Sequence, residues 1–103
     1  MEKIEKLKSF LAASPDEPFL KHALGLEYIK LGDDSIAREL FLEILTANPS
    51  YIGTYYHLAH LLERAGEMEN AKNWYEKGME AAKEAGEIHA YNELQAAYEE
   101  LIA

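Results

Sequence analysis

Histidine and glutamate are the residues of this 103-residue chain whose spacing could support metal chemistry. His57 and His60 are three residues apart, so they share roughly one face of a helix, and Glu63 follows a further turn on. His22 and His89 could approach from neighbouring helices. Histidines at helical spacing can bind zinc, but no HExxH motif, cysteine or aspartate cluster accompanies them. A histidine-based metal-binding protein is therefore kept as an alternative, and no cofactor is expected.

The glycines, serines and glutamates, which could serve catalysis in other proteins, are explained here by their structural roles. Gly32 and Gly66 stand where helices should end, so no glycine-rich phosphate-binding loop is present. The serines fall at helix ends or in turns, where capping explains them. The glutamates lie on faces predicted to be solvated, and no pair of them is demonstrably buried for acid–base work. The absence of cysteine excludes disulfides and thiolate nucleophiles. We therefore predict that the protein is not an enzyme.

The charge of the chain limits its partners. Nineteen acidic and ten basic residues give a formal charge of −9, which argues against nucleic acid and anionic membrane surfaces. No apolar run approaches the length of a membrane span, and the sequence MEKIEKLKSF lacks a signal-peptide core. A cytoplasmic location is the default expectation. An origin as a domain of a larger protein stays open.

Apolar residues at helical spacing predict that six helices position these side chains. The expected ranges are 2–13, 17–31, a third from Asp33 or Asp34 to Asn48, then 51–65, 68–85 and 87–102. Asp16 and Ser50 are expected to cap the second and fourth helices, and glycines are expected to end the second, fourth and fifth. The inward face of the first helix should include Ile4, Leu7, Phe10 and Leu11, and that of the second Leu20, Ala23, Leu24, Tyr28 and Leu31.

One pattern occurs twice in residues 18–83, at a spacing of 34 residues. Leu24-Gly25 recurs as Leu58-Ala59, and Tyr28 recurs as Leu62. The remaining matches pair Gly32 with Gly66, Ala37 with Ala71, and Phe41 with Tyr75. The small residues allow two antiparallel helices to approach, and the large residues fill the space beside them.

This pattern resembles the tetratricopeptide repeat, a 34-residue helix-turn-helix unit. The resemblance implies an all-α, right-handed α-solenoid of antiparallel helix pairs. It divides the chain into an N-terminal half repeat (1–15), repeat 1 (18–51), repeat 2 (52–85) and a C-terminal capping helix (87–102). Lys83 stands where the family has proline, so the fifth helix can extend, and Lys21 stands where an aromatic residue is often found.

In such repeats the first helix of each pair lines a concave groove. The residues that the resemblance places in a partner-binding groove are Phe19, His22, Leu26, Ile29, Tyr56, His60, Glu63, Arg64 and His89. The apolar members are anchors suited to a peptide or a helix, and the histidines would make binding depend on pH near neutrality. One subclass binds carboxylate tails through Lys, Asn and Arg, but His22 and Leu26 replace two of these, so we reject that specificity.

The predicted function is a protein–protein interaction scaffold that binds a peptide or helix of unknown identity in the concave groove. A self-associating module, forming a homodimer by end or groove packing, is the first alternative. The metal-binding protein is the second. If the first or last helix instead folds over the groove, the groove residues belong to the core.

Overall fold

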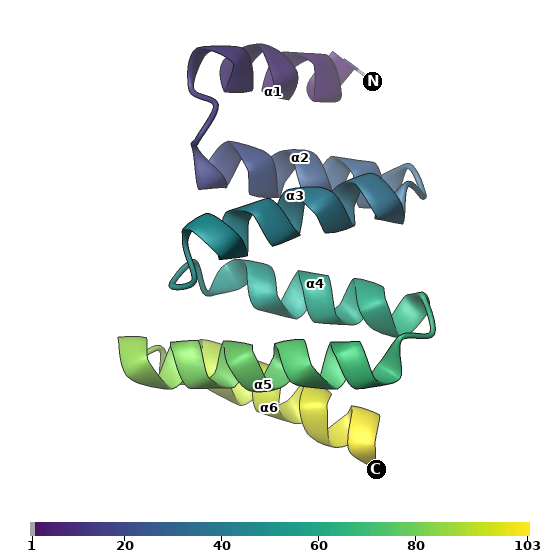
Figure 1. The fold of residues 1–103 in the computed structure, drawn as a ribbon, viewed down its shortest axis with the longest axis vertical. Coiled ribbons are helices and arrows are strands. Elements are labelled where there is room, and N and C mark those ends of the chain that lie inside the picture. The colour runs from purple at the N-terminus through teal and green to yellow at the C-terminus, as the bar shows by residue number, and fades with distance from the viewer. Residues whose placement is uncertain (1) are drawn as a thin grey trace. The chain divides into compact units, whose positions relative to one another are not determined.

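The computed structural model describes residues 2–103. Within these residues the chain forms six α-helices and no strand (Figure 1). The helices are α1 (Glu2–Ala13), α2 (Pro18–Lys30), α3 (Asp34–Ala47), α4 (Gly53–Arg64), α5 (Met68–Ala85) and α6 (Ile88–Ile102). The predicted all-α class and the order of the helices are confirmed. The chain divides into two compact units, one up to Asn48 and the other Pro49–Ala103.

Two of the predicted helix caps are wrong. Glu17, not Asp16, precedes α2, and its Oε1 accepts a hydrogen bond from the Phe19 amide at 3.3 Å. Ser50 lies in a turn, and α4 begins only at Gly53. The turn has its own stabilising bond, because the Tyr55 hydroxyl donates to the Pro49 carbonyl at 2.5 Å. A side chain from the helix therefore satisfies the turn, and the helix starts after it.

The predicted glycine ends are confirmed. Gly32 has φ of +80°, a conformation that a side chain would oppose. This turn lets the Asp33 amide donate to the Tyr28 carbonyl at 2.9 Å, which satisfies one of the free carbonyls of α2. Gly66 and Gly86 repeat the same arrangement after α4 and α5.

The first unit is built on α2, which packs against both α1 and α3 (Figure 1). Its buried apolar residues are Ile4, Leu24, Ala37, Phe41, Ile44 and Leu45. The packing between α2 and α3 is close, because a Cβ atom at Gly25 would lie 2.5 Å from the Phe41 ring. The small residue predicted at this position is therefore required by the packing.

Two side chains predicted to face inward are exposed in the first unit. Phe10 is 58% exposed and Leu31 is 52% exposed. Ile4 is the buried residue of α1, so the face that carries Phe10 is not the one that α2 covers. Leu31 lies beyond the last residue of α2, in the turn that Gly32 forms. Helical spacing identified apolar side chains but not the neighbour that would cover them.

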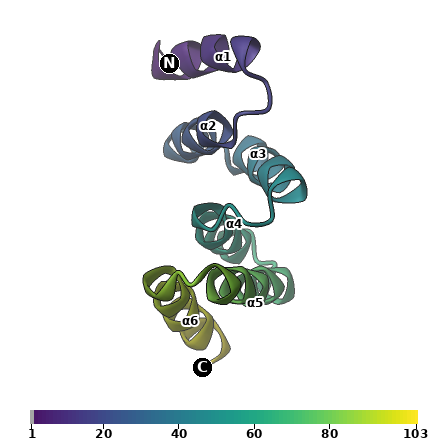
Figure 2. The ribbon, with the colours of Figure 1, turned by 90° about the vertical axis from the view of Figure 1, so that its left-hand side faces the viewer.

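In the second unit α5 packs against both α4 and α6 (Figure 2). The buried apolar residues are Tyr55, Leu58, Ala59, Leu61, Leu62, Ala71, Tyr75, Ala82 and Leu94. Gly78 is the point of closest approach, since a Cβ atom there would lie 2.7 Å from Tyr55 Cβ and 3.1 Å from Leu94 Cδ1. Because Gly78 has no side chain, α4 and α6 can both pack closely against α5 at this position.

Candidate partner-binding site

The predicted groove residues of the first unit all lie on α2 but differ in exposure. Phe19 is 64% exposed in the first turn of the helix. His22, Leu26 and Ile29 are half-buried. The centre of the His22 ring lies 5.6 Å from that of the core residue Phe41, so packing against the core covers part of the His22 side chain. Phe19 is therefore the most exposed of the predicted groove residues in this unit.

Three of the predicted residues form a cluster in the second unit with Tyr75. The Tyr56 ring stacks on His60 at a centroid distance of 5.9 Å. His60 Nδ1 lies 3.8 Å from Glu63 Oε2, and the same oxygen accepts a short hydrogen bond from the Tyr75 hydroxyl. Tyr75 comes from α5 and has no exposed surface. The cluster therefore joins the surface of α4 to the buried side of α5.

A depression of about 510 Å³ lies beside this cluster, between α4 and α6. We call it the α4–α6 hollow, and it is lined by Tyr56, His57, Glu93, Ala96, Ala97 and Glu100. Of these six residues, Tyr56 is one of the predicted groove residues. A sequence signal was available: Glu93 and Glu100 are seven residues apart, which places them on one face of α6 with two alanines between them.

Two predicted residues of the second unit, Arg64 and His89, belong neither to this cluster nor to the lining of the α4–α6 hollow. Arg64 is the exposed last residue of α4. The His89 side chain is 92% exposed in the first turn of α6, and its Nε2 lies 3.5 Å from Glu93 Oε2. His89 therefore contacts a residue of the hollow without lining it.

Two groups have shifted pKa values here: Tyr75, which is buried beside the hollow, and His57, which lines it. Burial raises the pKa of Tyr75 far above its usual value, and the hydrogen bond to Glu63 and the charges of Glu63, Tyr56 and Glu100 add to the effect. Burial also lowers the pKa of His57, with a smaller contribution from His60. Tyr75 thus remains a hydrogen-bond donor, and neutral His57 is favoured.

Comparison with known proteins gives the family. A sequence profile of the tetratricopeptide repeat matches residues 20–51 and 52–84. The chain belongs to the tetratricopeptide-repeat family. A TPR repeat-containing protein of Pseudomonas aeruginosa is 29% identical over 91 residues, which cover 88% of this chain and 87% of that protein.

Solved tetratricopeptide-repeat structures agree with this assignment. The solution structure of a tetratricopeptide repeat domain protein from Salinibacter ruber has a TM-score of 0.81 and 39% identity, covering 84% of this chain and 88% of that one. The first TPR of Spaghetti, bound to the HSP90 peptide SRMEEVD, has a TM-score of 0.76 and 24% identity over 97% of this chain and 78% of that one. The predicted family and fold class, an α-solenoid of antiparallel helix pairs, are confirmed.

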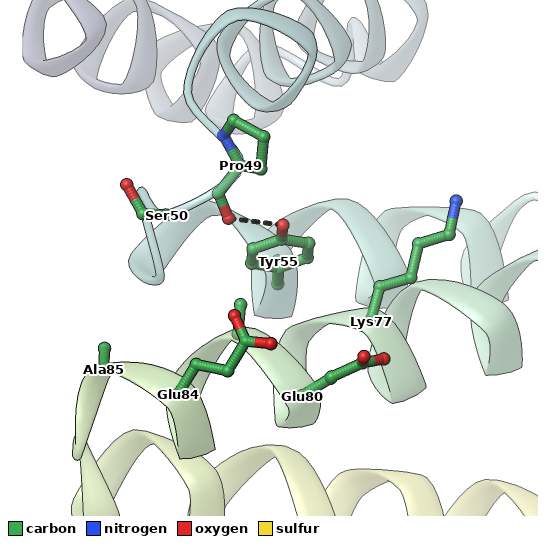
Figure 3. Close-up of a pocket in the computed structure, with 8 residues that line it drawn as sticks. Pro49, Ser50, Tyr55, Lys77, Glu80, Glu84 and Ala85 are labelled. Carbon is green, nitrogen blue, oxygen red and sulfur yellow. Dashed lines mark hydrogen bonds between the residues drawn. The ribbon is translucent and has the colours of Figure 1, made fainter.

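This tetratricopeptide-repeat chain has a further depression in its second unit, of about 570 Å³. We call it the α4–α5 hollow, and it is lined by Pro49, Ser50, Tyr55, Lys77, Glu80, Ala81, Glu84 and Ala85. Figure 3 shows Tyr55 with its hydroxyl directed at the Pro49 carbonyl. Lys77 Nζ lies 4.5 Å from the centre of the Trp74 ring. The lining of the α4–α5 hollow therefore includes both positively and negatively charged side chains. Its tyrosine hydroxyl is already hydrogen-bonded within the protein.

The histidine spacing suggested metal binding as an alternative function. Across residues 2–103, no three histidine, aspartate or glutamate side chains come together as ligands for a metal ion. His57 and His60 instead contact the Tyr56 ring from two directions. None of the helices that the structure describes is long and apolar enough to span a membrane.

Proposed function

We propose that the chain is a protein–protein interaction scaffold whose second unit binds a peptide or a helix of a partner in the α4–α6 hollow. The hollow itself carries this proposal, because a partly exposed aromatic ring, two alanines and a few polar groups form a concave surface. Such a surface offers an anchor pocket with polar groups that orient a ligand. The proposal involves no catalytic step.

The geometry around Tyr56 supports the choice of this surface. Its side chain is 38% exposed, while its ring contacts His57, His60 and Tyr75 at centroid distances of 5.7, 5.9 and 6.3 Å. A ring held on several sides loses little conformational entropy when a ligand covers it. Tyr56 is therefore a pre-organised anchor.

One structural neighbour supports a peptide as the type of ligand. The first TPR of Spaghetti, which shares the fold, is bound to an HSP90 peptide. In the first unit, Phe19, Leu26 and Ile29 offer a separate apolar surface on α2, which we propose as a second contact with the partner.

A peptide display library of random twelve-residue sequences tests this proposal. Peptides selected on the whole chain should bind the wild type and lose most of their affinity for Ala96→Met, which fills the hollow with an unbranched, helix-compatible side chain. Asn73→Met is the matched control, because Asn73 is exposed on α5 and lines neither hollow. Peptides that bind Ala96→Met as well as the wild type would place the site elsewhere.

Self-association is a second candidate, and the exposure of Phe10 favours it. An aromatic side chain that is 58% exposed on α1 could pack against another copy of the chain. Sedimentation velocity over a range of concentrations should then show a dimer that Phe10→Ser abolishes. A wild-type chain that sediments as a monomer at every concentration would eliminate this candidate.

A further inference from the structure

The lining of the α4–α6 hollow is negatively charged. It contains the carboxylates of Glu93 and Glu100 and no lysine or arginine. Helix α6 itself has no basic residue other than His89. Residues 49–103 contain ten acidic residues and four lysines and arginines, which are Arg64 at the end of α4 and Lys72, Lys77 and Lys83 on α5. A ligand in the hollow therefore meets negative charge from α6.

Little within the unit neutralises these carboxylates. The partner of Glu93 is His89, at 3.5 Å, and this pair is ionic only when the histidine is protonated. The charge of Glu100 helps to raise the pKa of Tyr75, so its field reaches the buried side of the hollow. Because His57 has a lowered pKa, it adds no positive charge to the wall near neutral pH.

The aromatic wall suits the same type of ligand as the carboxylates. The face of a tyrosine ring attracts a cation, and the attraction is larger when the ring is fixed and partly desolvated. Tyr56 meets both conditions through its contacts with His60 and Tyr75. Ala96 and Ala97 leave space on α6 for the methylene groups of a long side chain.

We infer that the α4–α6 hollow holds a lysine or arginine side chain of the partner, with its charged end near Glu93, Glu100 and the Tyr56 ring and its stem along Ala96 and Ala97. This inference rests on the proposed function and adds the chemistry of the partner. An acidic peptide is disfavoured, because its carboxylates would meet those of α6 without a basic residue in the lining.

Four short peptides test the inference. They share the sequence GSAXASG with blocked ends, and X is lysine, arginine, norleucine or glutamate. Titration of the isotope-labelled whole chain, followed by the NMR amide shifts of Tyr56, His57, Ala96 and Ala97, gives each dissociation constant. The lysine and arginine peptides should bind at least about fivefold more tightly than the norleucine peptide, and the glutamate peptide should bind most weakly.

Matched variants assign the effect to the two carboxylates. Glu93→Gln and Glu100→Gln should each weaken binding of the lysine peptide by about two- to fivefold, as expected for partly exposed ion pairs. Glu84→Gln removes the same charge from the α4–α5 hollow and should leave the affinity unchanged. Added salt should reduce the preference for lysine over norleucine.

The outcomes separate this inference from the proposed function. Equal binding of the norleucine and lysine peptides at the hollow would overturn the inference and leave peptide binding intact. Shifts confined to Ala81 and Ala85, lost in Glu84→Gln, would place the cation in the α4–α5 hollow and would also overturn it. If none of the four peptides shifts the hollow amides, the inference fails, whereas the library selection decides the proposed function independently.

Discussion

Gly78 should be the glycine whose replacement by alanine most directly tests the packing of the second unit. A Cβ atom at this position would lie 2.7 Å from Tyr55 Cβ, 3.0 Å from Tyr55 Cγ and 3.1 Å from Leu94 Cδ1. Carbon atoms in good contact are about 3.5–4.0 Å apart. Because Tyr55 Cβ is bonded directly to the backbone of α4, rotation of the tyrosine ring cannot relieve the overlap. Helices α4 and α5 must therefore move apart.

The expected magnitude is a balance of two terms. Overpacking of a well-packed core costs about 1–3 kcal/mol, while alanine in place of glycine inside a helix gains up to about 1 kcal/mol. We therefore expect Gly78→Ala to lower the free energy of unfolding by about 1 kcal/mol. Gly53→Ala is the control, because nothing lies within 4 Å of its added Cβ atom, and it should be neutral or stabilising.

Urea unfolding followed by circular dichroism measures both variants. The difference in unfolding free energy between Gly53→Ala and Gly78→Ala isolates the packing cost and should be about 1–3 kcal/mol, with unchanged slopes. Since Tyr55 belongs to α4 and Leu94 to α6, Gly78→Ala should also weaken binding of the lysine peptide in the α4–α6 hollow. If Gly78→Ala were as stable as Gly53→Ala, the close approach of these helices would be refuted.

Three further predictions follow from contacts of single residues. Tyr75→Phe should lower the free energy of unfolding by about 1–2 kcal/mol, because the hydrogen bond to Glu63 is lost while the Glu63 carboxylate keeps some access to water. A double-mutant cycle with Glu63→Gln, measured by urea unfolding, should assign this loss to the pair. Gly32→Ala should cost about 1 kcal/mol, because φ is +80° there, and thermal melting should show it; an unchanged melting temperature would contradict that backbone conformation. The pKa of His57 is lowered by burial and then by the charge of His60, so the unfolded chain binds more protons as the pH falls below the ordinary value of 6.5. Stability should therefore fall on acidification through this window, and urea unfolding across it should show a shallower fall for His57→Gln; equal slopes would remove His57 as the cause.

The helices and most of the core could be predicted because their signals are local. Proline and glycine end helices through their own backbone restrictions, and the repeat at 34 residues places the small residues opposite the large ones. The prediction failed for Asp16 and Ser50, where neighbouring residues or a turn took the capping position. It failed for Phe10 because apolar spacing on a helix does not say which side of that helix has a neighbour.

The α4–α6 hollow could be predicted only in part, because it depends on how α6 is rotated against α4. Tyr56 follows from the register of the repeat. The side of α6 that faces it follows from the length of α5, which continues to Ala85, and from the left-handed turn at Gly86. One residue of difference in such a turn rotates a helix by about 100°. The repeat pattern does not specify this rotation for a helix that follows an extended partner.

The α4–α6 and α4–α5 hollows together show why shape alone does not identify a ligand. Both have volumes near 500–600 Å³, and each is lined by a tyrosine and two glutamates. In the α4–α5 hollow, Lys77 supplies a positive charge and the Tyr55 hydroxyl is bonded to Pro49. In the α4–α6 hollow no lysine or arginine lines the surface, and the Tyr56 ring is partly exposed. A cation gains attraction from both carboxylates only where no basic side chain of the protein competes for them, so the absence of lysine and arginine from α6 decides where the cation binds.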